Sequence, residues 1–600
     1  MAEEFYKEVI YNRVAENILI MQNSNAPKFI KKILSPLNVQ LNRFTLFTLL
    51  LILTTFALSL FFLAALIAIR LKQTTGFDDA YMYIRYAKNF WRGYGIAWNR
   101  DGVQTYGVTS ILYFAIITIF QGVLPKLDGS IILTLTSAGS SILGVLLIAV
   151  TCTRYSKSES IHNSIFLTLA ILTTALVSSN VFLFHLTSGM DTTLSFLCNS
   201  LLIFTVLNWV HGKDKHSLLK VLAAGFLSFL GRPDNLIYAV TFPILYVLLM
   251  ENNGRTGKVI RFLLGLGICL AVDAFLKTLI FGGPLPLPFY AKTNGFFDGY
   301  LSPQIWSPIT QLFDFGKLSL PYMLVIIFIF SASEKATRIA LAFFLPVLAT
   351  FAYYFNVLQI MGHEARYYFP SLPFFIVSCV LIFDNFIDLQ TNGKVASTVK
   401  SKLLRWGLAG SLTIFLLTPN IQSGVEKVYE KFFIPPPRVY VSAAKYVTPA
   451  NQPLPTLGWL PSIKIVSALA KNLPDGTRFA MSEYGLAGSQ ATQIYIIDPL
   501  GLHDPFFAHH GFSADNFFSR DPEIIWFPHR DYSKIITALQ DSPNLWKYYD
   551  YYPSAFDYGL AIKKDGINHD AIYAEVEKAW KNAYGSNNMQ KYLARLGGNK

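Results

Sequence analysis

Long apolar runs separated by short polar segments fill most of the first 420 residues. A helix that spans a lipid bilayer needs about 20 mostly apolar residues. A further apolar run, 108–124, is ambiguous by this criterion, and the charge distribution is needed to assign it. The runs that we predict as eleven membrane-spanning helices are 46–69, 131–151, 164–184, 193–209, 216–230, 235–250, 261–281, 318–332, 338–358, 370–386 and 404–418.

Basic residues gather in every second loop between these predicted helices. With the polar segment 1–43 in the cytoplasm, the positive-inside rule places the basic loops in the cytoplasm too. All of them reach that side only if 108–124 does not cross, so we predict that this run is re-entrant or lies on the outer interface. The alternative is that it crosses and that a further helix follows it. The basic residues are Arg154, Lys157, Lys213, Lys215, Lys220, Arg255, Lys258, Arg261, Lys335, Arg338, Lys394, Lys400, Lys402 and Arg405.

Residues 420–600 have a different pattern, in which helical periodicity and short strand-like runs are mixed. This mixture predicts a soluble α/β domain, which the charge rule places outside the cytoplasm. The run Pro435-Pro436-Pro437 is typical of a stiff linker. The helical runs are 463–472, 533–540 and 568–584, and the strand-like runs are 477–481, 493–497 and 558–563.

The predicted organisation therefore has three parts. A cytoplasmic N-terminal segment covers 1–43, a transmembrane module covers 44–419, and the soluble domain covers 420–600. The first outer loop of the transmembrane module is 70–130.

The composition excludes a soluble globular chain and a disordered one. It is 52% hydrophobic and 14% charged, whereas soluble domains carry about 25% charged residues. The four cysteines lie in or beside apolar runs, which argues against a disulfide scaffold. The cytoplasmic loops account for the net charge of +13, so we expect a lipid bilayer as a partner and no nucleic acid. His503, His509 and His510 lack the spacing of a zinc site.

The unusual polar residues fall almost entirely in the loops assigned to the outer side. A transporter more often places such residues in mid-span, beside broken helices. Polar residues at one membrane face favour an enzyme that works at the outer interface. These loops are 70–130, 185–192, 231–234, 282–317 and 359–369, followed by the C-terminal domain.

The first outer loop carries two adjacent carboxylates, Asp78 and Asp79, close to the end of the first predicted span. Charged groups at this depth are costly to place without a function. The segment YMYIRYAKNFWRGYG that follows has helical periodicity, with aromatic residues on one face and cations on another. We predict an interfacial helix with its apolar face in lipid. A helix cap would account for one of the two carboxylates but not for both.

Four further outer segments combine carboxylates, cations and aromatic residues: SGMD at 188–191, GRPD at 231–234, PLPFYAKT at 286–293 and HEARYY at 363–368. Each is weak alone, since such arginines commonly snorkel to the interface and such aspartates commonly cap helices. Because carboxylates and cations recur in the loops of the outer side, we predict that they belong to one functional site there. The residues of interest are Asp191, Arg232, Asp234, Tyr290, Lys292, His363 and Arg366.

These segments resemble a known family. The block F-D-D-A-Y-x-Y-x-R-Y-A-x-N-x-x-x-G-x-G-x-x-W-N at 77–99, followed by YGVTS at 106–110, resembles the first outer loop of GT-C glycosyltransferases. It is most similar to the terminal β-(1→2)-arabinofuranosyltransferases of mycobacterial cell-wall arabinan. SGMD, GRPD and PLPFYAKT are similar to that family's SGLE-, RPD- and PNTFYAK-like segments, with Asp191 in place of Glu. EYG at 483–485 and IDPLGLHD at 497–504 resemble its E-x-G and D-x-x-G-L-x-D elements.

The resemblance implies a GT-C fold, that is, a polytopic α-helical membrane protein with a C-terminal α/β exterior domain. It implies a location in the bacterial cytoplasmic membrane and a polyprenyl-phosphate sugar donor. Arabinofuranose is the sugar that it favours. The acceptor would be a hydroxyl of a glycan, glycolipid or protein at the outer face.

Inverting transfer from a lipid phosphate needs a carboxylate base for the acceptor hydroxyl and cations for the departing phosphate. We predict Asp78 as the base. Asp79 would orient it or bind a divalent cation, Mg²⁺ or Mn²⁺. The residues predicted to bind the donor phosphate are Arg232, Lys292, Arg366, Tyr290 and His363, and those predicted to bind substrate are Asp191, Asp234, Glu483, His503 and Asp504.

Two other classes stay open. A lipid-linked oligosaccharide transporter or flippase would not require Asp78, and a structural or assembly protein would require none of these residues. Inside the predicted spans, Asp273 and Lys277 stand four residues apart. A buried ion pair is the expected explanation for them.

Overall fold

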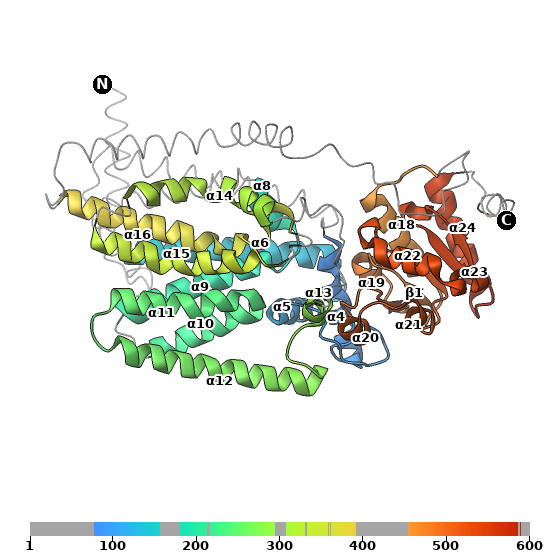
Figure 1. Cartoon of the computed structure of the whole chain (residues 1–600), viewed down its shortest axis with the longest axis horizontal. Coiled ribbons are helices and arrows are strands. Elements are labelled where there is room, and N and C mark those ends of the chain that lie inside the picture. The colour runs from blue at the N-terminus through green and yellow to red at the C-terminus, as the bar shows by residue number, and fades with distance from the viewer. Residues whose placement is uncertain are drawn as a thin grey trace, which may run out of the picture. The chain divides into compact units, whose positions relative to one another are not determined.

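The computed structural model describes residues 77–156, 180–212, 216–293, 308–329, 333–357, 359, 362–391, 454–585 and 589. All of these residues belong to one compact unit of the chain, and Figure 1 shows their helices and strands in colour. Several predicted features lie outside the described residues: the spans at 46–69 and 404–418, most of the span at 164–184, and the linker at 435–437.

Apolar helices dominate the described residues before 392. Six of these segments are long and apolar enough to cross a membrane, and they confirm the spans predicted at 131–151, 193–209, 235–250, 261–281, 338–358 and 370–386. The helices are α6 (Gly129–Tyr155), α9 (Thr192–His211), α11 (Leu236–Met250, in the apolar segment Pro233–Met250), α12 (Arg255–Phe281), α15 (Glu334–Tyr354) and α16 (Leu372–Thr391, in the apolar segment His363–Phe386).

The helices α8 (Asn180–Thr187), α10 (Ser217–Gly231) and α14 (Pro308–Ile329) also belong to this part of the chain. The run predicted at 216–230 is the shorter apolar helix α10, and the run predicted at 318–332 is the second half of α14. The count of eleven spans stays a prediction. Phenylalanine, tyrosine and leucine from most of these helices form one apolar core.

The ambiguous run 108–124 forms α5 (Ile111–Val123), a helix of 13 residues that Ser110 caps by accepting the N–H of Tyr113. At 1.5 Å per residue this helix is about 20 Å long, which is less than the roughly 30 Å of a bilayer core. Tyr113 and Ile117 are buried, whereas Ile119 and Val123 are exposed. The length agrees with the expectation that this run does not cross.

The first outer loop continues through η2 (Asp78–Tyr81), α4 (Met82–Asn89) and η3 (Phe90–Tyr94). The prediction that the apolar face of this helix lies in lipid is wrong. Tyr83, Tyr86 and Ala87 are buried, because α4 packs between α5 and the C-terminal domain. Periodicity identified the apolar face correctly but could not say what covers it.

The C-terminal domain is α/β, as predicted, with one five-stranded sheet in the order β2-β1-β3-β5-β4. The strands β2, β1 and β3 are parallel, and β5 runs antiparallel to both β3 and β4. The strands are β1 (Arg478–Ala480), β2 (Tyr495–Ile497), β3 (Ile524–Trp526), β4 (Tyr549–Tyr552) and β5 (Leu560–Lys563).

Helices cover this sheet, and three of them confirm the helical runs predicted at 463–472, 533–540 and 568–584. The helices are α18 (Trp459–Asn472), α19 (Gly485–Gln490), α20 (Pro505–His510), α21 (Ala514–Phe518), α22 (Ser533–Asp541), α23 (Pro543–Tyr548) and α24 (His569–Tyr584). Apolar side chains of the first outer loop and of this domain share a single core. The first outer loop therefore packs against the C-terminal domain as part of its core.

Candidate active site

Asp78 fastens the first outer loop to the C-terminal domain. Its buried carboxylate accepts the backbone N–H of Gly485 at 2.6 Å and that of Leu486 at 2.8 Å. These N–H groups lie in the first turn of α19, where a helix offers them no internal partner. A Cβ at Gly485 would lie 1.9 Å from the carbonyl oxygen of Asp78, so the approach requires glycine.

The charge of Asp78 is held in an environment that disfavours it. Burial raises the pKa of Asp78, the nearby charge of Glu483 raises it further, and the two N–H donors oppose the rise. Both carboxylate oxygens are already engaged by α19. The structure therefore gives Asp78 a clear task in holding this helix.

Arg85 holds the other end of α19. Its side chain is fully buried, and its guanidinium lies 4.9 Å from the ring centroid of Trp98. A carboxylate at the start of a helix and a cation at its end match the partial charges of the two termini. Lys88 adds a hydrogen bond to the carbonyl oxygen of Ser489. The five hydrogen bonds of Arg85 go to the carbonyl oxygens of Trp98, Gly488, Ala491 and Ile494 and to the side chain of Asn99.

Asp79, the next residue, is half-buried, and its carboxylate accepts no hydrogen bond from the described residues. Burial raises the pKa of Asp79, the positive charges of Arg366 and Lys292 oppose the rise, and the charge of Asp191 adds to it. A carboxylate with a raised pKa takes up a proton more readily near neutral pH. Asp79 is thus a carboxylate whose oxygens accept no hydrogen bond within the described part of the chain, and it lies near two cations.

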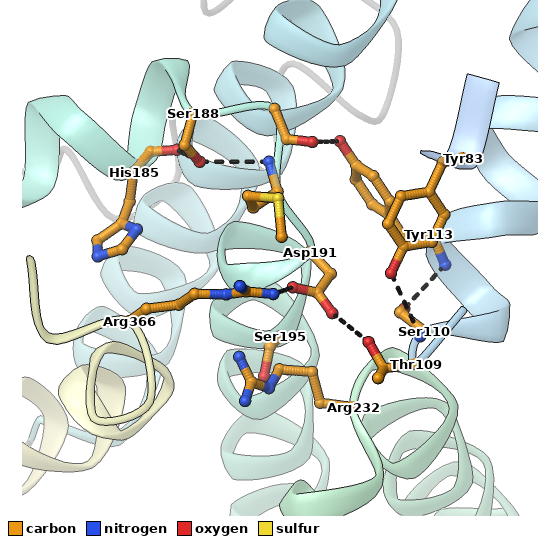
Figure 2. A network of polar contacts seen from close by, with 12 residues as sticks. Tyr83, Thr109, Ser110, Tyr113, His185, Ser188, Asp191, Ser195, Arg232 and Arg366 are labelled. Atoms are coloured by element: carbon orange, nitrogen blue, oxygen red, sulfur yellow. Dashed lines mark hydrogen bonds and ion pairs between the residues drawn. The ribbon is translucent and has the colours of Figure 1, made fainter. Parts of the chain in front are cut away.

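Asp191 lies at the centre of a polar network at the start of α9 (Figure 2). One carboxylate oxygen accepts from the guanidinium of Arg366 at 3.2 Å, and the other accepts from the hydroxyl of Thr109 at 3.4 Å. Asp191 is buried, and Arg366 retains one buried N–H, at Nε, without a partner among the described residues. Two neighbouring tyrosines, Tyr83 and Tyr113, pack edge to face beside the network.

Arg232 and Asp234 form a bidentate ion pair, with N···O distances of 3.0 and 2.7 Å. The hydroxyl of Tyr354 also donates to Asp234, and the guanidinium of Arg232 lies 5.3 Å from the ring centroid of Tyr367. The buried Nη1 of Arg232 has no hydrogen-bond partner among the described residues. Figure 2 shows Arg232 and Arg366 near the same carboxylate, Asp191.

The remaining predicted donor-binding residues lie on short helices. Lys292 and Tyr290 belong to α13 (Leu287–Thr293), and the exposed Lys292 forms no ion pair with another described residue. The ring of Tyr290 contacts that of His509 on α20, with centroids 4.4 Å apart. His363 lies in the short turn η6 (His363–Ala365), with its ring 6.0 Å from that of Phe77.

The predicted substrate residues of the C-terminal domain fall into two groups. Glu483 lies beside Asp78 and Asp79. Burial raises its pKa, the charge of His529 and the hydrogen bond from Trp459 oppose the rise, and the charge of Asp79 adds to it. His503 and Asp504 instead make contacts within the protein. The buried ring of His503 stacks on Trp98 with centroids 3.9 Å apart, and Asp504 caps α20 and pairs with Arg520 at 2.9 Å.

The described residues do not fit a divalent cation. Among them, no group of three or more His, Cys, Asp or Glu side chains is arranged to hold a metal. The charges that act most strongly on Asp79 are those of two cations, Arg366 and Lys292, which would repel Mg²⁺ or Mn²⁺. We therefore assign no chemical step to a metal.

Sequence reasoning did not identify several residues that shape this region. Arg85 belongs to the segment whose cations are predicted to share one helix face, and nothing in the sequence indicates that it is buried and makes five hydrogen bonds. Thr109 and Tyr83 belong to conspicuous motifs, but a hydroxyl that contacts a distant aspartate leaves no local signal. The predicted pair Asp273 and Lys277 is confirmed as an ion pair at 2.7 Å, with both side chains largely buried.

Comparison with known proteins adds a structural relative. No family model matches the chain, and no curated protein matches it in sequence. The crystal structure of ArnT from Cupriavidus metallidurans in the apo state matches it with a TM-score of 0.50 at 11% identity. The match covers 85% of this chain and 98% of that chain. A likeness at this identity shows a shared fold, and it agrees with the expected architecture of a polytopic helical membrane module with a C-terminal α/β domain.

Proposed function

We propose that the chain is an inverting glycosyltransferase that uses a polyprenyl-phosphate sugar donor at the outer face of the membrane. The proposal rests on the environment of Asp79. Its half-buried carboxylate accepts no hydrogen bond from the described residues, and the positive charges of Arg366 and Lys292 act on it. A single displacement at an anomeric carbon needs a base on one side and cations for phosphate on the other. The fold shared with ArnT supports this class.

Within this proposal the two adjacent aspartates have different tasks. Asp79 takes the proton of the attacking hydroxyl, while Asp78 holds α19 in place through Gly485 and Leu486. Lys292 and Arg366 bind the phosphate. Arg232 is a further candidate, because its Nη1 has no hydrogen-bond partner among the described residues. No covalent intermediate is needed, since the hydroxyl oxygen displaces the lipid phosphate directly.

The resemblance of the first outer loop favours arabinofuranose as the sugar. Asp191 stands where the similar family has Glu, and it lies in the network with Arg366 and Thr109. A carboxylate in such a network is suited to accept hydrogen bonds from sugar hydroxyls. The acceptor class stays open at this point among glycan, glycolipid and protein.

The test is product formation by the purified full-length protein in detergent. Candidate polyprenyl-phosphate sugars are incubated with hydroxyl-bearing acceptors, and products are identified by mass spectrometry. Asp79→Asn should lower transfer by about 10²–10⁴-fold, as expected for a lost general base. Polyprenyl-phosphate binding should persist. Normal transfer by this variant would refute the role of Asp79.

The same assay separates the enzyme from the flippase alternative. Detergent removes the two compartments, so a flippase can produce no chemical change there. If wild-type protein binds the donor but forms no product with any sugar and acceptor pair, while it moves the donor across vesicle membranes, the transporter becomes the better explanation.

A further inference from the structure

The sheet of the C-terminal domain has a topological switch point between β1 and β3. From β1 the chain passes through α19 to β2 on one side, whereas β3 pairs with β1 on the other side, and all three strands are parallel. In open α/β sheets, ligands bind outside the carboxyl ends of the strands at such a point. The segments that follow the two strands are 481–483 and 527–531.

These two segments place Glu483 and His529 together. The backbone N–H of His529 donates to the hydroxyl of Ser482 at 3.0 Å, which ties the segments to each other. The charges of His529 and Asp531 both act on Glu483. The helix α18, which contacts α19, contributes Trp459 to the same place (Figure 1).

Three polar side chains at this point, those of Glu483, Tyr558 and His529, have donor or acceptor atoms that make no strong hydrogen bond with the described residues. The indole N–H of Trp459 donates to Oε2 of Glu483 at 3.1 Å, whereas Oε1 has only a 3.5 Å contact with the hydroxyl of Ser482. The hydroxyl of Tyr558 bonds to no described residue, and His529 uses Nδ1 alone, toward a neighbouring aspartate. Glu483, Tyr558 and His529 are all half-buried.

Aromatic rings surround these polar groups and are held in fixed positions. Tyr558 stacks on the buried Trp526, with centroids 5.2 Å apart and planes at 25°. The ring of His529 packs edge to face on Tyr558 at 5.1 Å. A sugar ring offers apolar C–H faces to such rings and vicinal hydroxyls to a carboxylate, a phenol and an imidazole.

The switch point lies next to the proposed base. Glu483 stands two residues before Gly485, whose backbone N–H donates to the carboxylate of Asp78 at 2.6 Å, and Asp79 directly follows Asp78. The charge of Asp79 also acts on Glu483. A ligand bound by Glu483 could therefore present a hydroxyl to Asp79. The same carboxylates, together with Asp531, would repel an anionic ligand.

From this geometry we infer that the carboxyl ends of β1 and β3 bind the acceptor, and that the acceptor is a neutral sugar residue of a glycan. The inference rests on the proposed function and adds the acceptor class to it. Glu483, Tyr558 and His529 hydrogen-bond the sugar hydroxyls, and the rings of Trp459 and Tyr558 contact the sugar faces. The donor site, with Asp79 and Lys292, is a separate set of residues.

Two conservative variants and one matched control test this site. Tyr558→Phe removes the spare hydroxyl but keeps the ring on Trp526, and Glu483→Gln keeps an oxygen for the indole of Trp459. Tyr548→Phe is the control, because Tyr548 is exposed and precedes β4, whose first residue pairs with Lys563 at the opposite end of the sheet.

The measurement is binding of neutral oligosaccharides of arabinofuranose, galactofuranose, mannose or glucose to the full-length protein in detergent, by saturation-transfer NMR and calorimetry. At least one should bind the wild-type protein and Tyr548→Phe, and both site variants should bind it about tenfold more weakly. Binding of polyprenyl phosphate, measured in parallel, should be the same in all four proteins.

Two results would overturn the inference: no neutral oligosaccharide binds at millimolar concentration, or the affinities are equal in all four proteins. Binding of a serine- or threonine-containing peptide in place of the sugars would also overturn it and would make the acceptor a protein. Failure of the proposed function has a different signature, because oligosaccharide binding would then persist without any sugar transfer.

Discussion

Replacing Asp78 by asparagine tests whether the main role of this residue is to hold the first turn of α19 in place by hydrogen bonds. The carboxylate offers one oxygen to the N–H of Gly485 and one to that of Leu486. The amide of Asp78→Asn offers one oxygen and one NH₂ group. One of the two backbone N–H groups would then face another donor, and the negative charge at the start of the helix would be lost.

The magnitude follows from the contacts that change. A hydrogen bond to a charged group contributes about 1.5–3 kcal/mol, and an unsatisfied buried N–H costs about 1–3 kcal/mol. Part of this loss is offset, because burial makes the charged form of Asp78 costly and raises its pKa. We expect a net loss of about 2 kcal/mol in the stability of the first turn of α19, which corresponds to about thirtyfold more frequent local opening.

Amide hydrogen exchange of the full-length protein in detergent measures this opening directly. Peptides that cover Gly485–Gln490 should exchange faster in Asp78→Asn, while peptides from α9 should be unchanged. Asp79→Asn is the matched control, since Asp79 accepts no hydrogen bond from the described residues. Unchanged exchange of α19 in Asp78→Asn, or an equal change in both variants, would refute the fastening role.

Three other predictions concern the donor site, the pH dependence of stability and the docking of the loop. Lys292→Ala should weaken polyprenyl-phosphate binding by about ten- to a hundredfold, which is the contribution of one charge-assisted contact. Expression should be normal, because Lys292 is exposed. Unchanged affinity in a lipid-binding assay would show that Lys292 is not part of the donor site. Asp498 is buried, and burial raises its pKa from the ordinary 3.8 to about 7. The folded protein therefore binds this proton more tightly than the unfolded chain does. The free energy of unfolding should fall as pH rises from about 4 to about 7, by at most about 4 kcal/mol. Urea unfolding across this range should give a flatter profile for Asp498→Asn, and equal slopes would contradict the assignment. A Cβ at Gly107 would lie 2.0 Å from Nδ1 of His503, so Gly107→Ala should lower the stability by about 1–3 kcal/mol through overpacking. The variant should also be cleaved faster by proteases at the junction of the first outer loop and the C-terminal domain. Cleavage at the wild-type rate would contradict this close packing.

The sequence predicted the membrane helices well because their signal is local. The run 131–151 has no charged residue, and the run 261–281 is apolar except for Arg261, Asp273 and Lys277, so the local hydropathy is enough to mark each as a membrane span. The α/β character of the C-terminal domain was also readable, but β3 and β4 were missed. Ile524–Trp526 is three residues long and fully buried, so it shows no alternation, and the four residues of β4 are three tyrosines and an aspartate.

The candidate site was harder to predict because its contacts are distant in sequence. Asp78 and Gly485 are 407 residues apart, and Arg85 and Ile494 are 409 apart. Local pattern showed that two adjacent carboxylates need an explanation, but it could not show which of them has a partner. Helical periodicity likewise placed Arg85 on the cationic face of its helix without showing that it donates to carbonyl oxygens of the C-terminal domain.

The two aspartates are coupled by the geometry of the turn that holds them. η2 is a 3₁₀ turn with three residues per turn, so side chains of successive residues point about 120° apart. When Asp78 is fixed on Gly485 and Leu486, Asp79 must point elsewhere, and the charges acting on it are those of Arg366 and Lys292. Loss of α19 docking would therefore misplace Asp79 and lower transfer even if Asp78 never touches the substrate. A drop in activity for Asp78→Asn alone thus cannot identify the base, whereas a drop for Asp79→Asn with normal exchange of α19 can.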